Sequence, residues 1–237
     1  MSVLNPSIIH IWHTTLEAHA KKYELFKSWL SSEEKIRAER LAISFRPGFI
    51  VSRAILRDLL AYYSKQSPQH LKLTYCASGK PLMGPGVHLE FNLSHSKNIL
   101  VYAFTIDTPV GIDIEYINHR IHLDKIAYRF LSADEYDQLQ VLQGINKLKA
   151  FFNAWSRNEA LIKAMGDTLR THPYSRYKLS LDHQGNNLKY IKKKITSSYA
   201  ISNLSLYSDF ATAIAIKGKE KPIVIKKYFK SMFGLNN

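Results

Sequence analysis

The sequence predicts an α+β fold, in which strands and helices gather in separate stretches of the chain. The order of strand, helices and strands occurs in residues 1–108 and again in residues 109–237. Each stretch also holds a Ser-x-x-Glu motif, Ser31 with Glu34 and Ser132 with Glu135, which is typical of the first turn of a helix. The segment 107–109 is the expected joint between the two halves.

The first half begins with a run of apolar residues that predicts a buried strand over 8–12. Helical spacing covers 17–29, and the Ser31 motif starts another helix. Pro47 stands in the first turn expected for a third helix, which runs to about Tyr63. Three strand-like segments follow, at 71–75, 90–94 and 98–105.

In the second half, a strand at 110–116 precedes a helix near 122–130, the helix that Ser132 starts, and a long helix over 146–165. Five strands are then expected, at 177–182, 188–191, 199–207, 210–216 and 222–227. The segment 221–233 mixes Lys with apolar residues. Its alternation favours a closing edge strand, although a membrane-surface contact fits the same composition.

Composition describes a basic globular protein. The chain has 237 residues, 46% of them apolar, and a net charge of +14. Such a charge predicts an anionic partner: nucleic acid, a membrane surface, a phosphorylated cofactor or an acidic protein. A nucleic-acid-binding module would carry a basic stripe interleaved with aromatic residues, which the sequence lacks. The single cysteine, Cys76, excludes an intrachain disulfide. Without a signal-like or membrane-spanning segment, we expect a cytoplasmic protein that does not bind nucleic acid or a membrane.

Three carboxylates carry the expected chemistry. On a strand, Asp113 and Glu115 share one face while Ile112 and Ile114 share the other. The same alternation also fits an ordinary half-buried strand whose polar face lies in solvent. Helical spacing, however, places Glu159 within the apolar face of the helix over 146–165, where an unpaired charge is costly. Lys163 follows it one turn later. Three such oxygen ligands suit Mg²⁺, whose remaining ligands are waters and phosphate oxygens.

Two other segments point to phosphate binding. Ser94 and His95 close an expected strand and present a hydroxyl and an imidazole, although a structural histidine fits as well. A nucleophilic serine is disfavoured because the Gly-x-Ser-x-Gly elbow is absent. Gly79-Lys80-Pro81 places a cation in a tight turn, without the full pattern of a phosphate-binding loop.

In order along the chain, these segments resemble the Sfp-type 4′-phosphopantetheinyl transferases. The resemblance covers about residues 30–180 and rests on five motifs: Gly79-Lys80-Pro81, Phe91-Asn92-Leu93-Ser94-His95-Ser96, Gly111-Ile112-Asp113-Ile114-Glu115, Ile126-Ala127-Tyr128-Arg129-Phe130 and Trp155-Ser156-Arg157-Asn158-Glu159-Ala160-Leu161-Ile162-Lys163. It implies a pseudo-dimer of two similar α+β halves with the active site at their junction. Residues 1–108 would contact coenzyme A, and residues 109–237 would hold the metal site and contact the carrier protein.

The resemblance also implies an activity. Such enzymes move the phosphopantetheine arm of coenzyme A to a serine of an acidic acyl or peptidyl carrier protein and release adenosine 3′,5′-bisphosphate. A protein of this size would act as a monomer, in fatty-acid, polyketide or nonribosomal peptide synthesis.

Roles for individual residues follow from the same resemblance. Asp113, Glu115 and Glu159 would hold Mg²⁺, and Glu159 would also take the serine proton. Lys163 would contact the phosphates and stabilise developing charge. The expected coenzyme A contacts are Arg37, Arg53, Gly79, Lys80, Pro81, Ser94, His95, Asp113 and Lys163, with Arg37 and His95 at the 3′-phosphate and His95 also in the catalytic set.

Two positions depart from the family pattern. Asn158 stands where the family often has Lys, and Thr168 stands where it favours Gly. A Mg²⁺-dependent phosphohydrolase built on the same carboxylates is the alternative enzyme, and it would need its own residue to activate water.

Overall fold

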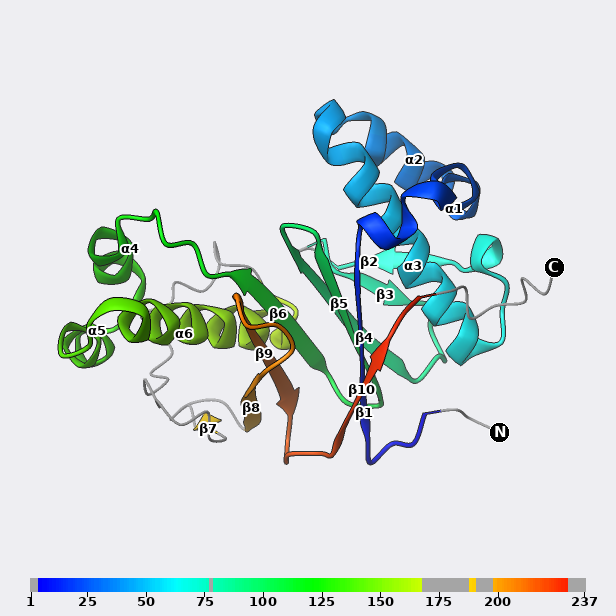
Figure 1. Cartoon of the computed structure of the whole chain (residues 1–237). Helices are drawn as coiled ribbons and strands as arrows, with labels where there is room; N and C mark the ends of the chain where they lie inside the picture. Colours follow the sequence, from blue (N-terminus) through cyan, green and yellow to red (C-terminus); the bar gives the residue numbers. More distant parts are fainter. Residues whose placement is uncertain (1–3, 77–78, 168–187, 191–197, 230–237) are drawn as a thin grey trace.

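The computed structural model describes residues 4–76, 79–167, 188–190 and 198–229 (Figure 1). It confirms the α+β fold, with two four-stranded sheets of order β10-β1-β5-β4 and β6-β9-β8-β7 and a two-stranded sheet β2-β3. The first half contains β1 (Ile9–Thr15), η1 (Glu17–Lys22), α1 (Tyr23–Trp29), α2 (Ser32–Glu39), η2 (Ile43–Phe45), α3 (Arg46–Ser64), η3 (Pro68–His70), β2 (Leu73–Tyr75), β3 (Pro81–Met83), β4 (Leu89–Ser96) and β5 (Ile99–Ile106). The second contains β6 (Val110–Tyr116), α4 (Leu123–Phe130), α5 (Ala133–Gln140), α6 (Gly144–Met165), β7 (Leu188–Tyr190), β8 (Tyr199–Leu204), β9 (Phe210–Lys217) and β10 (Ile223–Lys227).

The same connectivity occurs in both halves. β1 pairs antiparallel with β5 and β5 with β4, just as β6 pairs with β9 and β9 with β8. Both expected capping boxes are present, because Ser31 and Ser132 each exchange hydrogen bonds with the glutamate three residues later. The long helices α3 and α6 occupy corresponding positions in the two element orders. Figure 1 shows the two units side by side.

Several boundaries differ from the sequence prediction. The helix expected over 17–29 begins as the 3₁₀ helix η1 and continues as α1. The short strand β3 was not predicted. The edge strand expected over 222–227 is confirmed as β10, and it pairs parallel with β1, in the sheet of the first half. The strand expected at 177–182 lies outside the described residues.

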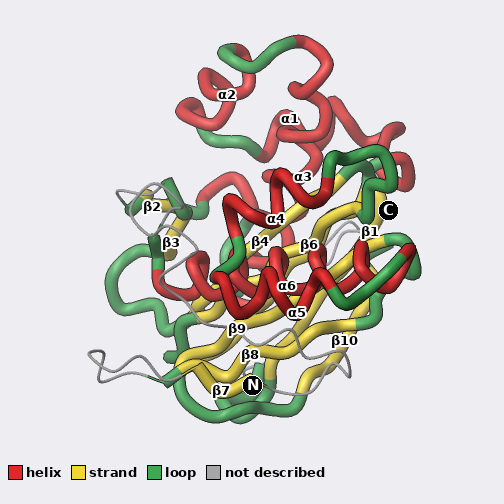
Figure 2. Tube along the Cα trace, turned by 90° about the vertical axis from the view of Figure 1, so that its left-hand side faces the viewer, coloured by secondary structure: helices red, strands yellow, loops and turns green. Residues whose placement is uncertain are grey.

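Apolar side chains fix how the sheets meet. Ile112 and Ile114 of β6 and Ile214 of β9 pack against Ile11 of β1 and Val101 of β5 in one buried cluster. This contact turns the opposite face of β6 toward α6. In Figure 2, α4, α5 and α6 lie in front of the strands. Asp113 and Glu115 therefore face the helix that carries Glu159, as the alternation predicts.

Within the described residues, no helix has the length and apolar character needed to cross a membrane.

Candidate functional site

Gly111 allows α6 to lie unusually close to β6. A Cβ atom at this position would be 2.0 Å from the Ala160 carbonyl oxygen and 2.4 Å from the Ala164 nitrogen. Both are backbone atoms, so no side-chain adjustment could make room. The glycine therefore brings the Glu159–Lys163 turn of the helix against the carboxylates of the strand.

Asp113, Lys163 and Ser94 form the centre of the site. The Lys163 ammonium donates to Asp113 Oδ1 at 2.6 Å and to Ser94 Oγ at 3.0 Å, and Ser94 Oγ donates to the same Oδ1 at 2.9 Å. Asp113 is only 2% exposed. Its other oxygen, Oδ2, is buried and has no hydrogen-bond partner in the described part of the chain. A buried carboxylate oxygen in this state calls for a cation or a proton.

Glu115 and Glu159 add negative charge beside this centre. The pKa of Glu115 is raised to about 7, chiefly by desolvation and then by the charges of Asp113 and Glu159, while Lys163 and a hydrogen bond from Ser96 act in the opposite direction. The charges of Asp113 and Glu159 therefore act on Glu115 by electrostatic repulsion. Concentrated like charge of this kind is what a bound cation relieves.

The donor set fits a hard divalent cation. The unpartnered Asp113 Oδ2 and the charge-crowded Glu115 are oxygen ligands of the type that Mg²⁺ prefers. Among the residues that the structure describes, no three metal-binding side chains already converge on one point. Asp113 Oδ1 is engaged by Lys163, so Oδ2, together with Glu115 and Glu159, would be the group of oxygens available to hold the ion.

Glu159 does not lie inside the fully buried face of α6, as its spacing suggested. Trp155, Glu159 and Lys163, each four residues apart, are half-buried, whereas the neighbours Asn158 and Ile162 are buried. The three form a stripe along the border of the buried face. Glu159 is thus partly exposed, and it is close enough to Glu115 for its charge to raise the pKa of that carboxyl.

A ladder of small polar side chains joins β4 to β6. Ile112 N donates to Asn92 Oδ1 at 2.9 Å, Ser94 meets Asp113, and Tyr116 N donates to Ser96 Oγ at 2.9 Å. Positions 92, 94 and 96 share a strand face, so the ladder follows from alternation. Sequence patterns indicated Ser94 as a site residue but assigned no role to Asn92 and Ser96, although all three fall on one face of the expected strand.

Comparisons with known proteins point to one family. Residues 109–215 match the family described as the 4′-phosphopantetheinyl transferase superfamily. The 4′-phosphopantetheinyl transferase HetI of Nostoc sp. is 36% identical over 163 residues, which cover 67% of this chain and 69% of that protein. The chain belongs to the 4′-phosphopantetheinyl transferase superfamily.

Other relatives of the chain carry the same name. A putative 4′-phosphopantetheinyl transferase of Synechocystis sp. is 34% identical over 147 residues, covering 60% of this chain and 58% of that protein. The 4′-phosphopantetheinyl transferase psf-1 of Bacillus pumilus is 36% identical over 151 residues, covering 62% of each chain. A holo-(acyl-carrier-protein) synthase from Bacillus anthracis in complex with CoA (3′,5′-ADP) is 25% identical and covers 46% of this chain and 94% of its own, with a TM-score of 0.39.

The arginines expected at coenzyme A lie together in the transferase, on α2 and α3. The guanidinium carbons of Arg37 and Arg53 are 5.7 Å and 5.5 Å from the centre of the Phe49 ring, and that of Arg53 is also 5.9 Å from the Tyr75 ring. Arg37 is exposed, whereas Arg53 is buried with its Nη1 unpartnered in the described structure. Two like charges around aromatic rings form a site ready for an anion.

The remaining residues expected at coenzyme A include His95 and the Gly79–Pro81 segment. His95 is exposed at the end of β4; partial desolvation, and then the Lys163 ammonium, lower the pKa of its imidazole. The Lys80 ammonium is turned inward and donates to the carbonyl oxygens of Val110 and Lys163. Pro81 is buried at the start of β3.

The position that departs from the family pattern is buried. Asn158 Nδ2 donates to the Ala154 carbonyl one turn earlier, and Oδ1 has no partner among the described residues. A lysine at this position would have to extend its chain out of the core. Thr168 lies outside the described residues.

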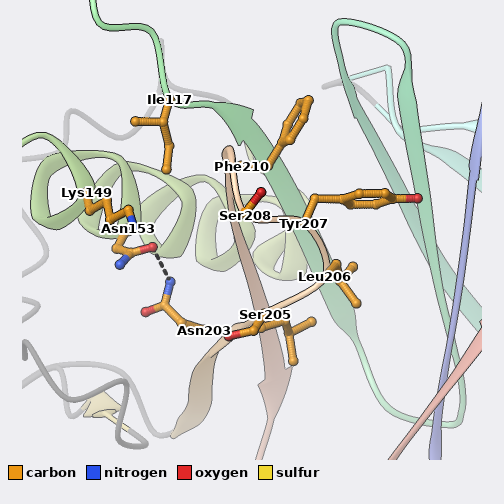
Figure 3. Close-up of a pocket in the computed structure, with 10 residues that line it drawn as sticks. Ile117, Lys149, Asn153, Asn203, Ser205, Leu206, Tyr207, Ser208 and Phe210 are labelled. Atoms are coloured by element: carbon orange, nitrogen blue, oxygen red, sulfur yellow. Dashed lines mark hydrogen bonds between the residues drawn. The ribbon is translucent and has the colours of Figure 1, made fainter. Parts of the chain in front are cut away.

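An open pocket of about 470 Å³ begins where the carboxylate face of β6 ends (Figure 3). Ile117, two residues beyond Glu115, lines it together with Lys149 of α6 and the β8–β9 loop. Asn203 donates to Asn153 across the pocket at 3.3 Å and accepts from Arg157 at 2.6 Å. These bonds tie α6 to β8 beside the site.

Proposed function

We propose that the chain transfers 4′-phosphopantetheine from coenzyme A to a serine of an apo acyl or peptidyl carrier protein and releases adenosine 3′,5′-bisphosphate. The observation that carries the proposal is the buried Asp113, which has one oxygen paired with Lys163 and the other without a partner among the described residues. Phosphoryl transfer needs reactants held in line and developing charge neutralised. A cation position beside a fixed ammonium meets both needs.

In the proposed reaction, Asp113, Glu115 and Glu159 hold Mg²⁺, which supplies positive charge to the pyrophosphate of coenzyme A. The serine oxygen bonds to the phosphorus that carries pantetheine. The bond from this phosphorus to the bridging pyrophosphate oxygen breaks, and adenosine 3′,5′-bisphosphate leaves with that oxygen. Glu159 accepts the serine proton, a role that suits a half-buried carboxylate beside Glu115. Lys163 stabilises the charge that grows on the phosphate oxygens.

Coenzyme A would lie across the junction of the halves. Arg37 and His95 would hold its 3′-phosphate, Arg53 would add a further contact, and Ser94 and the backbone of 79–81 would border the rest. The half comprising residues 1–108 thus supplies most coenzyme A contacts, and residues 109–237 supply the metal site and the carrier contacts. We propose that the carrier is acidic, since the net charge of +14 would speed its association. The enzyme would act as a monomer in the cytoplasm, without nucleic acid or a membrane.

The test is incubation of the full chain with coenzyme A, Mg²⁺ and several apo carrier proteins, followed by intact-mass measurement. We expect one phosphopantetheine per carrier, and none with Asp113→Asn or Glu159→Gln, although both variants stay folded. Glu24→Gln, on an exposed position of α1, is the matched control and should transfer normally. Wild type that modifies none of the carriers contradicts the proposal. Breakdown of coenzyme A without a carrier would support the phosphohydrolase instead.

A further inference from the structure

Lys80 links the first half of the chain to the two elements that build the candidate active site. Its ammonium donates to the Lys163 carbonyl oxygen at 3.0 Å and to the Val110 carbonyl oxygen at 3.1 Å. Lys163 lies in the last turn of α6, and Val110 is the first residue of β6. One side chain therefore holds the end of the helix against the start of the strand.

The chemistry of the helix terminus favours this contact. The negative end of the helix dipole attracts a cation, and the Lys163 carbonyl, which accepts from the Gly166 N–H at 3.2 Å, has a second lone pair for the Lys80 ammonium. Burial lowers the pKa of Lys80, and the nearby Glu90 opposes that shift. A desolvated ammonium is costly unless its donors are used. The two carbonyl bonds supply that compensation without a ligand.

The β2–β3 hairpin that carries Lys80 is itself held in place. Cys76 N donates to the Lys80 carbonyl at 3.1 Å, and Gly79 adopts a φ of +81°, which only glycine accepts readily. At the other side of the hairpin, Tyr75 packs on Arg53 and reaches Glu34 Oε1 at 3.5 Å. The hairpin thus connects the arginine cluster of α2 and α3 to the base of the carboxylate site.

The consequence concerns the relative position of two charges. Lys163 sends its ammonium to Asp113 while its carbonyl is held by Lys80. Asp113 lies three residues after Val110, which Lys80 also holds. Without the ammonium of Lys80, the helix end and the strand start lose a common anchor, and the distance between Lys163 and Asp113 is no longer fixed.

We propose that Lys80 is a positioning residue, whose ammonium holds Lys163 and β6 in register for phosphopantetheine transfer instead of contacting coenzyme A. This role rests on the proposed function. It differs from the expectation drawn from family resemblance, in which Lys80 grips coenzyme A. Loss of a positioning residue should lower kcat, whereas loss of a coenzyme A contact should raise the Kd of coenzyme A.

The experiment compares wild type, Lys80→Met and the control Lys72→Met, which changes an exposed lysine before the same hairpin. We expect Lys80→Met to lower kcat for transfer by about 10- to 100-fold, because small misplacements of reacting groups have effects of this size. The Kd of coenzyme A should change by less than about threefold, since no contact to it is lost. Lys80→Arg, which keeps the cation and its donors, should recover part of the rate.

Hydrogen exchange supplies a readout independent of activity. In Lys80→Met, amides of 110–116 and 158–167 should exchange faster, and those of β5 should not change. If Lys80→Met does not fold, the same measurements of kcat, coenzyme A Kd and hydrogen exchange on Lys80→Arg test the proposal. A rise of tenfold or more in the Kd of coenzyme A at unchanged kcat, or exchange equal to wild type in both segments, overturns the inference. A wild type that transfers nothing defeats the proposed function, while the exchange data still test the anchor.

Discussion

Replacement of Gly111 by alanine tests whether close packing of α6 on β6 builds the site. The added Cβ would stand 2.0 Å from the Ala160 carbonyl oxygen, whereas ordinary contact begins at 3.4 Å. The helix must therefore retreat by about 1.4 Å, because backbone atoms cannot rotate away. That movement would break the bond of 2.6 Å between Lys163 and Asp113.

The expected loss of stability follows from this displacement. Overpacking in a core typically costs about 1–3 kcal/mol, and a clash with backbone falls at the upper end. The smaller unfolded-state entropy of alanine returns roughly 0.4–1 kcal/mol at most. A net loss of about 2–3 kcal/mol lowers Tm by roughly 4–12 °C in a chain of this size. Transfer should fall about 100-fold, since the charges move by more than 1 Å.

Urea and thermal unfolding measure the first effect, and the carrier-modification assay measures the second. Gly48→Ala is the matched control, because a Cβ there meets only the Leu16 side chain at 3.6 Å within α3. It should be neutral or stabilising by up to about 1 kcal/mol. A Gly111→Ala variant as stable and active as wild type would refute the packing account.

Three further predictions concern buried ionisable groups. Lys163→Met removes the ion-pair partner of the buried Asp113, so the free energy of unfolding measured by urea without metal should fall by about 3–5 kcal/mol. Part of this loss should be recovered when Mg²⁺ is added. An equal loss with and without Mg²⁺ would contradict the cation site. Arg57→Met leaves the buried Glu34 carboxylate without its cation and should cost a similar amount. A change under about 1 kcal/mol would show that the pair is dispensable. Burial lowers the pKa of His19 to about 4 from its usual 6.5, so the stability that this group contributes is present above pH 6.5 and is lost as pH falls toward 4, by up to about 3 kcal/mol. His19→Gln should flatten the acid side of the stability profile, and an unchanged profile would reject the assignment.

Local patterns in the sequence predicted much of the fold. Both capping boxes and the strand alternation at Asp113 and Glu115 depend on residues within four positions of each other. These features could therefore be predicted from the sequence without knowledge of the tertiary structure. The order of the elements, read in the same way, indicated a similar sequence of strand, helices and strands in each half, and the same strand pairing occurs in both.

Features that depend on distant segments were not predictable. Helical spacing placed Glu159 in the apolar face, but the width of the buried face is set by the sheet beneath it, and the residue lies at the border. Lys80 meets carbonyls 30 and 83 positions away, which no local pattern encodes. The parallel partner of β10 is likewise β1, at the other end of the chain.

The measurement that tests the carboxylate site most directly is calorimetric binding of coenzyme A to the full chain, with and without Mg²⁺. Asp113, Glu115 and Glu159 are proposed to hold the ion against the pyrophosphate. The affinity for coenzyme A should therefore rise at least about tenfold with Mg²⁺ in wild type, a gain of about 1.4 kcal/mol, and Asp113→Asn should abolish that gain. Equal affinities with and without Mg²⁺ in wild type would contradict the site.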